Sequence, residues 1–84
     1  MNTDDARSLL EELLGRIAPE VDLAGADPTA SMQESFDLDS MDFLNLVTEL
    51  HEETGIEVPE RDYPKLRTIE GFVDYVSSAS RSPA

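Results

Sequence analysis

The sequence contains no cysteine, which excludes a disulfide framework, a thiolate nucleophile and any cysteine-ligated metal site. It also contains no apolar run near the roughly 18 residues that a membrane span needs, and its acidic N-terminus lacks the basic start of a signal peptide. A chain without cysteine is compatible with a reducing compartment. We therefore expect a cytoplasmic protein with no membrane span.

Basic residues are scarce: six lysines and arginines stand against 19 acidic residues, for a net charge of −13. This charge repels nucleic acid phosphate, so we expect no nucleic acid partner. Ten of the acids lie between Glu34 and Asp62, where Arg61 is the one base. An acidic surface keeps a small protein soluble, but this concentration also favours an encounter with basic protein surfaces.

Histidine and lysine, two residues that can activate a serine as base, are nearly absent. His51 is the only histidine and Lys65 the only lysine. If one helix carries both Ser40 and His51, eleven residues separate them by about 16 Å along the axis, so His51 cannot activate Ser40 as a nucleophile. No Gly-x-Ser-x-Gly elbow is present. We therefore expect no catalytic residue, and a protein that is not an enzyme.

A metal site is the other chemistry that the acids suggest, since Asp37, Asp39 and Asp42 lie close together in sequence. The EF-hand pattern nevertheless fails, because Met41 occupies a ligand position, Asp42 replaces the glycine and Thr48 replaces the terminal glutamate. We expect no metal ligand in this chain.

Apolar residues recur with helical spacing in the first part of the chain. Asp4 or Asp5 can cap a first helix, and Pro19 follows its end. The apolar residues of this helix are Leu9, Leu10, Leu13, Leu14 and Ile17. Residues 19–38 are rich in Pro, Gly, Asp and Ser, and predict a long loop. The apolar residues that could pin this loop to the helices are Val21, Leu23, Met32 and Phe36.

Three more helices are predicted after the loop. The second covers about residues 40–53 and stops at Gly55, while Pro64 restricts the third to a short segment. Thr68 can cap the last helix, whose apolar residues are Ile69, Phe72, Val73 and Val76. The predicted fold is all-α: a small monomeric four-helix bundle, with three longer helices, a short third helix and a long loop between helices 1 and 2.

The residues at the start of the second helix fit two known N-terminal capping patterns. Asp39 as N-cap can accept a hydrogen bond from the first-turn backbone, and Asp42 can reach back in a capping box. Leu38 and Phe43 have the spacing of a hydrophobic staple. Ser40 then lies in the first turn, at the positive end of the helix dipole.

The second helix carries two apolar stripes when residues are placed about 100° apart. The stripe of Phe43, Leu46, Val47 and Leu50 predicts the core face. The second stripe, Met41, Leu44 and Thr48, lies well over a quarter turn away, and Asn45, Glu49 and Glu52 border it. It either packs under the long loop or forms an exposed strip for a partner.

These features together resemble the acyl carrier protein family. The resemblance rests on DSMD at 39–42, the acid-rich LVTELHEETG that follows, IEVPE at 56–60 and TIEGFVDYV at 68–76. It implies a carrier domain over residues 1–78, and we expect a disordered C-terminal tail at 79–84. It further implies that Ser40, within a motif that includes Asp39, carries a covalent 4′-phosphopantetheine arm, whose terminal thiol holds acyl groups as thioesters for fatty acid, polyketide or related lipid synthesis.

The resemblance also implies the partners. A separate phosphopantetheinyl transferase (holo-synthase) adds the arm from coenzyme A, and acyl-loading, condensing and modifying enzymes dock through basic patches. The residues expected to bind these partners are Met41, Asp42, Leu44, Asn45, Thr48, Glu49, Glu52 and Glu53.

The chain departs from the family pattern at several places. It has Asp37-Leu38 where Gly-Ala or Gly-Leu is common, and Asn45 and His51 where acids are usual. The Gly-Gly-[His/Asp]-Ser pattern of peptidyl carriers is absent, which makes aminoacyl cargo the weaker alternative. A non-carrier acidic helical interaction module, phosphorylated at Ser40, is the other alternative, although Phe43 at the +3 position departs from an acidic-directed kinase site.

Overall fold

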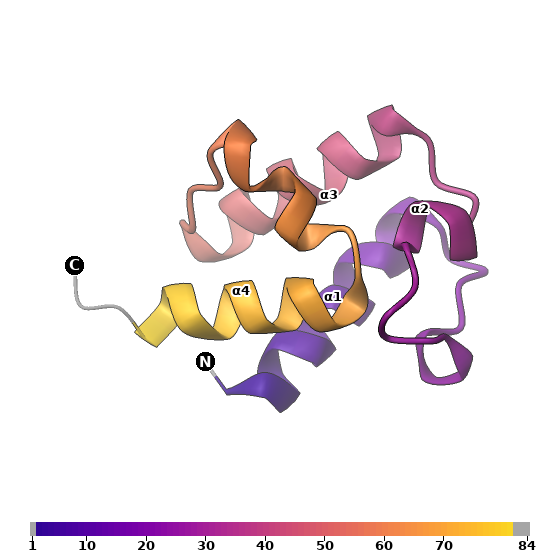
Figure 1. Ribbon diagram of the computed structural model, residues 1–84, viewed down its shortest axis with the longest axis horizontal. Coiled ribbons are helices and arrows are strands. Elements are labelled where there is room, and N and C mark those ends of the chain that lie inside the picture. Colours follow the sequence, from indigo (N-terminus) through magenta and orange to yellow (C-terminus); the bar gives the residue numbers. More distant parts are fainter. Residues whose placement is uncertain (1, 82–84) are drawn as a thin grey trace.

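The computed structural model describes residues 2–81, which are mostly helical (Figure 1). The α-helices are α1 (Thr3–Ile17), α2 (Met32–Ser35), α3 (Ser40–Thr54) and α4 (Ile69–Arg81). Two 3₁₀ helices, η1 (Leu23–Gly25) and η2 (Glu60–Leu66), complete the set. Within this range there is no strand, only an isolated antiparallel bridge between Ser31 and Thr68. The predicted all-α bundle of three longer helices and one short helix is confirmed.

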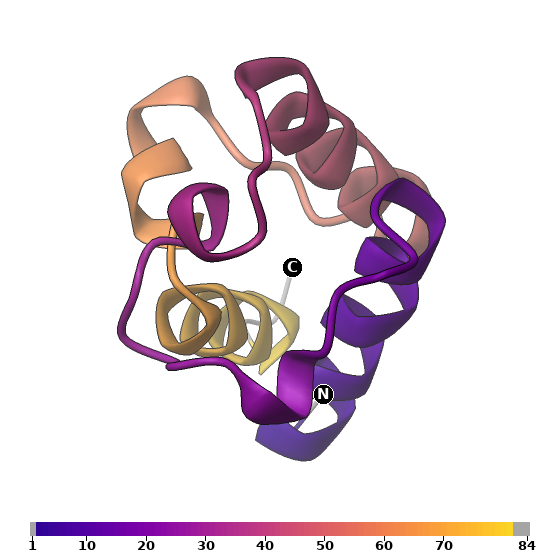
Figure 2. The ribbon, with the colours of Figure 1, turned by 90° about the vertical axis from the view of Figure 1, so that its right-hand side faces the viewer.

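The three long helices enclose one apolar core. α1 packs against both α3 and α4, and η2 packs against α4. Figure 2 looks nearly along α4 and shows these elements arranged around a common interior. The fully buried apolar side chains in this interior include Ala6, Leu10, Leu13, Leu46, Leu50, Leu66, Phe72 and Val76. Among residues 2–81, no helix combines the length and hydrophobicity that crossing a bilayer requires.

α1 begins slightly earlier than the sequence pattern suggests. Its N-cap is Asn2, whose Oδ1 accepts a hydrogen bond from the Asp5 backbone N–H at 2.8 Å. The expectation that Asp4 or Asp5 caps the helix was therefore wrong. Both aspartates lie in the first turn, where their charge still complements the helix dipole.

The long connection between α1 and α3 is held to the rest of the molecule at several points. Leu23 and Met32 are buried in the core, as expected from their apolar character. The Met32 backbone N–H donates to the Arg67 carbonyl at 2.7 Å, and the Glu70 N–H donates to the Pro28 carbonyl at 3.0 Å. The connection contains η1 and α2, two short elements that helical periodicity could not reveal.

The last two elements meet at Pro64 and Thr68. The segment around Pro64 is a seven-residue 3₁₀ helix, consistent with the expected short third helix. Thr68 caps α4 as expected, since its Oγ1 accepts from the Gly71 N–H at 2.9 Å. α4 continues through Arg81, so positions 79–81 of the expected tail are helical. Residues 82–84 of that tail lie outside the described residues.

Candidate functional site

The N-terminus of α3 has the local geometry that the sequence predicts. Asp39 Oδ1 accepts from the Asp42 N–H at 2.8 Å, and Asp42 Oδ2 accepts from the Asp39 N–H at 3.3 Å, which completes a capping box. Leu38 and Phe43, the expected staple pair, are both buried. Asp37 has φ of 55°, in the left-handed region that aspartate tolerates better than most residues. This conformation explains how Asp37 can stand where the family pattern has glycine.

Ser40 is the first residue of α3, and its side chain is exposed. Because Asp39 and Asp42 turn their carboxylates to each other's backbone, the hydroxyl of Ser40 is left at the positive end of the helix. Within residues 2–81 this hydroxyl has no hydrogen-bond partner. An electrophile can therefore reach it from solvent.

His51 lies toward the opposite end of α3. Its ring is exposed, and its Nδ1 is 3.3 Å from the Ile56 carbonyl oxygen. Eleven residues of one helix separate it from Ser40, so His51 cannot take a proton from the Ser40 hydroxyl. Among the described residues, no group of histidine and acidic side chains is arranged to hold a metal ion.

The outer face of α3, which we define as Met41, Leu44, Asn45, Thr48 and Glu52, is exposed along its length. Met41 is 66% exposed and Leu44 is 43% exposed, and these are the large apolar side chains that the described part of the chain leaves in solvent. The long loop does not cover them. Of the two interpretations of the second stripe, the exposed strip is therefore the one that fits.

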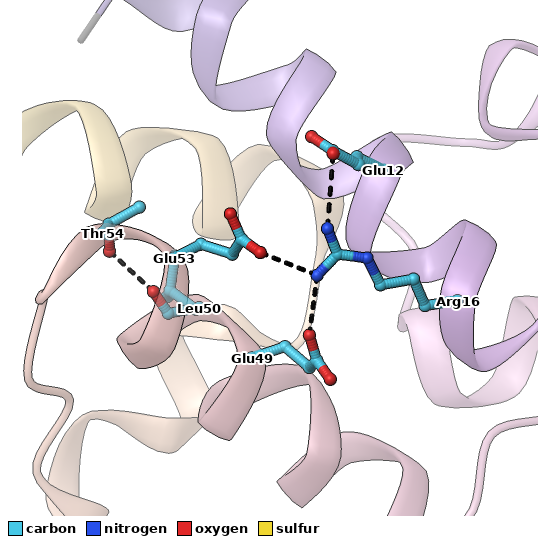
Figure 3. A network of polar contacts seen from close by, with 6 residues as sticks. All are labelled: Glu12, Arg16, Glu49, Leu50, Glu53 and Thr54. Carbon is cyan, nitrogen blue, oxygen red and sulfur yellow. Dashed lines mark hydrogen bonds and ion pairs between the residues drawn. The ribbon is translucent and has the colours of Figure 1, made fainter.

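Arg16 of α1 forms ion pairs with two acidic side chains of α3, a contact that the sequence did not reveal. Arg16 of α1 places Nη1 2.8 Å from Glu49 Oε2 and 2.8 Å from Glu53 Oε1, while Nη2 lies 3.3 Å from Glu12 Oε1 (Figure 3). The hydrogen bonds with Glu53 and then Glu49 raise the pKa of Arg16. Periodicity could not find this cluster, because 33 and 37 residues separate Arg16 from its partners on α3.

The expected partner-binding residues therefore differ in their surroundings. Glu49 and Glu53 face Arg16 across the α1–α3 contact, and Asp42 belongs to the cap. Glu52 has no ion pair or hydrogen bond within the described range. From helical spacing alone, Glu49 and Glu52 both border the exposed strip. In the structure, Arg16 of α1 pairs with Glu49 and not with Glu52.

A shallow groove lies beside the second half of α3. It has a volume of about 530 Å³ and is lined by Val47, Thr48, His51, Glu57, Val58 and Pro59. Val47 and His51 are each within about 20° of Ser40 around the helix axis. The groove thus opens on the side of α3 that carries Ser40.

The chain is similar to a family model and to several known proteins. Residues 4–76 match the family model described as "Phosphopantetheine attachment site". The chain is 41% identical to the "Acyl carrier protein" of Rubrobacter xylanophilus over 56 residues, which cover 67% of this chain and 69% of that protein. It is 32% identical to the "Acyl carrier protein" of Thermosynechococcus vestitus over 72 residues, covering 83% and 89%. It is also 36% identical to "Acyl carrier protein 2, mitochondrial" of Arabidopsis thaliana over 59 residues, covering 70% of this chain and 47% of that protein.

Proposed function

Because this chain belongs to the acyl carrier protein family, we propose that its 4′-phosphopantetheine arm is attached to Ser40, the first residue of α3. The protein is a carrier in acyl chain synthesis, and the arm supplies the thiol that holds acyl groups as thioesters. The observation that carries the assignment is the exposed Ser40 hydroxyl at the start of α3, between two carboxylates engaged in the cap.

The surroundings of Ser40 suit an attachment made by another enzyme. In the proposed step, Ser40 Oγ bonds to the phosphorus nearest the pantetheine in coenzyme A, the pyrophosphate bond breaks, and adenosine 3′,5′-bisphosphate leaves. A base of the transferase takes the hydroxyl proton, since His51 lies too far along the helix and the two carboxylates beside Ser40 are held in the cap. The α3 N-terminus favours the phosphodiester charge by about 0.3 to 1 kcal/mol. The groove at Val47 and Val58 then provides a surface along which the arm can lie.

We further propose that the outer face of α3 docks the partner enzymes. Met41 and Leu44 supply exposed apolar area next to Ser40, and Asn45, Thr48 and Glu52 surround it with polar groups. An apolar centre with a polar border is typical of a protein-binding surface. The expected partners are the phosphopantetheinyl transferase and the acyl-loading, condensing and modifying enzymes. A monomeric state and a cytoplasmic location remain predictions, which sedimentation and cell fractionation test.

Intact mass spectrometry tests the attachment site. After incubation with coenzyme A and a broad-specificity transferase, the wild type should gain the mass of one arm and Ser40→Ala should gain none. Ser35→Ala is the matched control, because Ser35 is also exposed and ends the short helix α2. It should be modified like the wild type. A Ser40→Ala chain that keeps native helicity and still gains the arm would refute the assignment.

A further inference from the structure

The acidic residues of α3 are not equally available to a partner. Asp42 is held in the capping box, and Glu49 and Glu53 share one nitrogen of Arg16 (Figure 3). Glu52 alone among the α3 acids makes no polar contact within residues 2–81. The number of acids in the sequence therefore overstates the charge that this helix presents.

The acids paired with Arg16 and the unpaired Glu52 also lie on different sides of the helix. At about 100° per residue, Glu52 lies within about 20° of Met41, at the centre of the outer face. Glu49 and Glu53 are about 80° and 120° away from Met41, on the flank that faces α1. Arg16 therefore offsets part of the negative charge on this flank and does not contact Glu52 at the centre of the outer face.

Building on the proposed function, we propose that Arg16 sets which partner the outer face of α3 accepts: a surface with an apolar pocket for Met41 and Leu44 and one cation for Glu52. A partner patch with several cations would gain little from Glu49 and Glu53, because Arg16 already occupies the place that a partner's arginine would take. Apolar complementarity would then contribute more to recognition than charge.

The cluster also predicts what removal of Arg16 would do. Glu49 and Glu53 have side chains that are 33% and 40% exposed, so both carboxylates would face solvent once the guanidinium is gone. The flank beside the docking face would carry one more unit of net negative charge, which would attract a basic partner during encounter. The change should appear as a faster, more salt-sensitive association.

Stopped-flow rates of Ser40 modification by the transferase, measured at limiting carrier concentration over a NaCl series, test the proposal. Arg16→Gln should be modified about threefold faster than the wild type at low salt, with a steeper salt dependence. Arg67→Gln removes the same charge from an exposed residue between η2 and α4, and should stay close to the wild type. Arg16→Lys keeps the charge and should restore the wild-type rate.

The proposal is overturned if Arg16→Gln and Arg67→Gln give the same rates and salt slopes. Glu52→Gln provides a second measurement that does not depend on the folding of Arg16→Gln. It should remove most of the salt dependence, and a slope equal to that of the wild type would also overturn the proposal. Failure of the proposed function is recognised separately, because then the wild type is not modified or Ser40→Ala is.

Discussion

Gly71 shows how one residue permits the contact between η2 and α4. A Cβ at this position would overlap the backbone carbonyl oxygen of Lys65 and lie 2.9 Å from Thr68 Oγ1. Backbone atoms of a packed helix cannot move aside cheaply. Glycine is therefore needed here for close approach. Gly15, in α1, differs because a Cβ added there would have no neighbouring atom within 4 Å.

Alanine substitutions at the two glycines should have opposite effects. Gly71→Ala should lower the free energy of unfolding by about 1 to 3 kcal/mol through overpacking against Lys65. Gly15→Ala should raise it by about 0.5 to 1 kcal/mol, since alanine loses less backbone entropy in a helix. Urea denaturation at neutral pH measures both. Equal stabilities for the two variants would contradict the close contact at Gly71.

A second informative residue is Tyr75, whose hydroxyl donates to Asp62 Oδ2 at 2.8 Å and connects α4 with η2. This hydrogen bond is the main cause that lowers the pKa of Asp62. Burial, followed by the contact with Asp62, raises the pKa of Tyr75 to about 12. The bond is therefore formed by a neutral phenol and an ionised carboxylate.

The pH dependence of stability should report this bond. The Asp62 contribution is present above its unfolded pKa of about 3.9 and is lost as the pH falls through the lower folded value. The Tyr75 contribution is present below about pH 10 and is lost as the pH rises towards about 12. The stability difference between wild type and Tyr75→Phe should thus be largest between about pH 4 and 10 and shrink on both sides.

Denaturation of both proteins across the pH range measures this difference. Asp62→Asn is the companion variant, because it removes the same charge-assisted bond from the other side. In this variant, as in Tyr75→Phe, the free energy of unfolding should depend less on pH in the acidic range. A difference between wild type and Tyr75→Phe that stays constant across the acidic, neutral and alkaline ranges would show that the bond does not contribute to stability.

At the scale of the element, α3 combines a structural face with a recognition face. Phe43, Leu46, Val47 and Leu50 are buried against the other helices, while Met41 and Leu44 face solvent. The capping box at Asp39 and the left-handed Gly55, with φ of 76°, mark the two ends of the helix. The core face fixes the helix in place, so that Ser40 and the outer face are presented at a constant orientation.

Truncation of one leucine on each face should separate the two roles. Leu46→Ala removes a fully buried side chain and should cost about 2 to 5 kcal/mol of stability. Leu44→Ala should cost less than about 0.5 kcal/mol, as surface substitutions usually do, but should slow modification of Ser40 by the transferase. Chemical denaturation and stopped-flow rates measure the two effects. Similar stability losses would mean that both leucines belong to a single buried face.

At the scale of the whole molecule, a net charge of −13 on 84 residues opposes the compact state. The Arg16 cluster reduces this repulsion locally, where it brings one cation between three carboxylates. Ten acids between Glu34 and Asp62 still lie within a molecule whose radius of gyration is 11.7 Å. Repulsion therefore acts across most of the structure.

Salt should stabilise the fold. Screening limits electrostatic interactions to about 10 Å at 0.1 M ionic strength, so added NaCl should raise the melting temperature. Circular dichroism melts at low and at moderate NaCl measure the shift, and KCl should act alike because screening depends on ionic strength. A melting temperature that falls with salt would mean that ion pairs such as Arg16–Glu49 outweigh the repulsion.

The features that depend on neighbouring residues along the chain follow from the sequence alone. The capping box of Asp39 and Asp42, the end of α3 at Gly55 and the buried stripe around Leu46 each arise within a few residues along one helix. Helix period and capping chemistry act at this range, so they can be predicted without the fold. The same reasoning predicted the exposed start of α3, where Ser40 lies.

Which distant groups meet depends on how the helices pack against one another. Arg16 reaches Glu49 and Glu53 because α1 packs beside α3, and Tyr75 reaches Asp62 because η2 lies against α4. A charged side chain in a sequence carries no record of its partner, since ion pairing requires only that two groups come within a few ångströms. The packing of the helices thus determines which acids of α3 are paired within the chain and which are left for a partner.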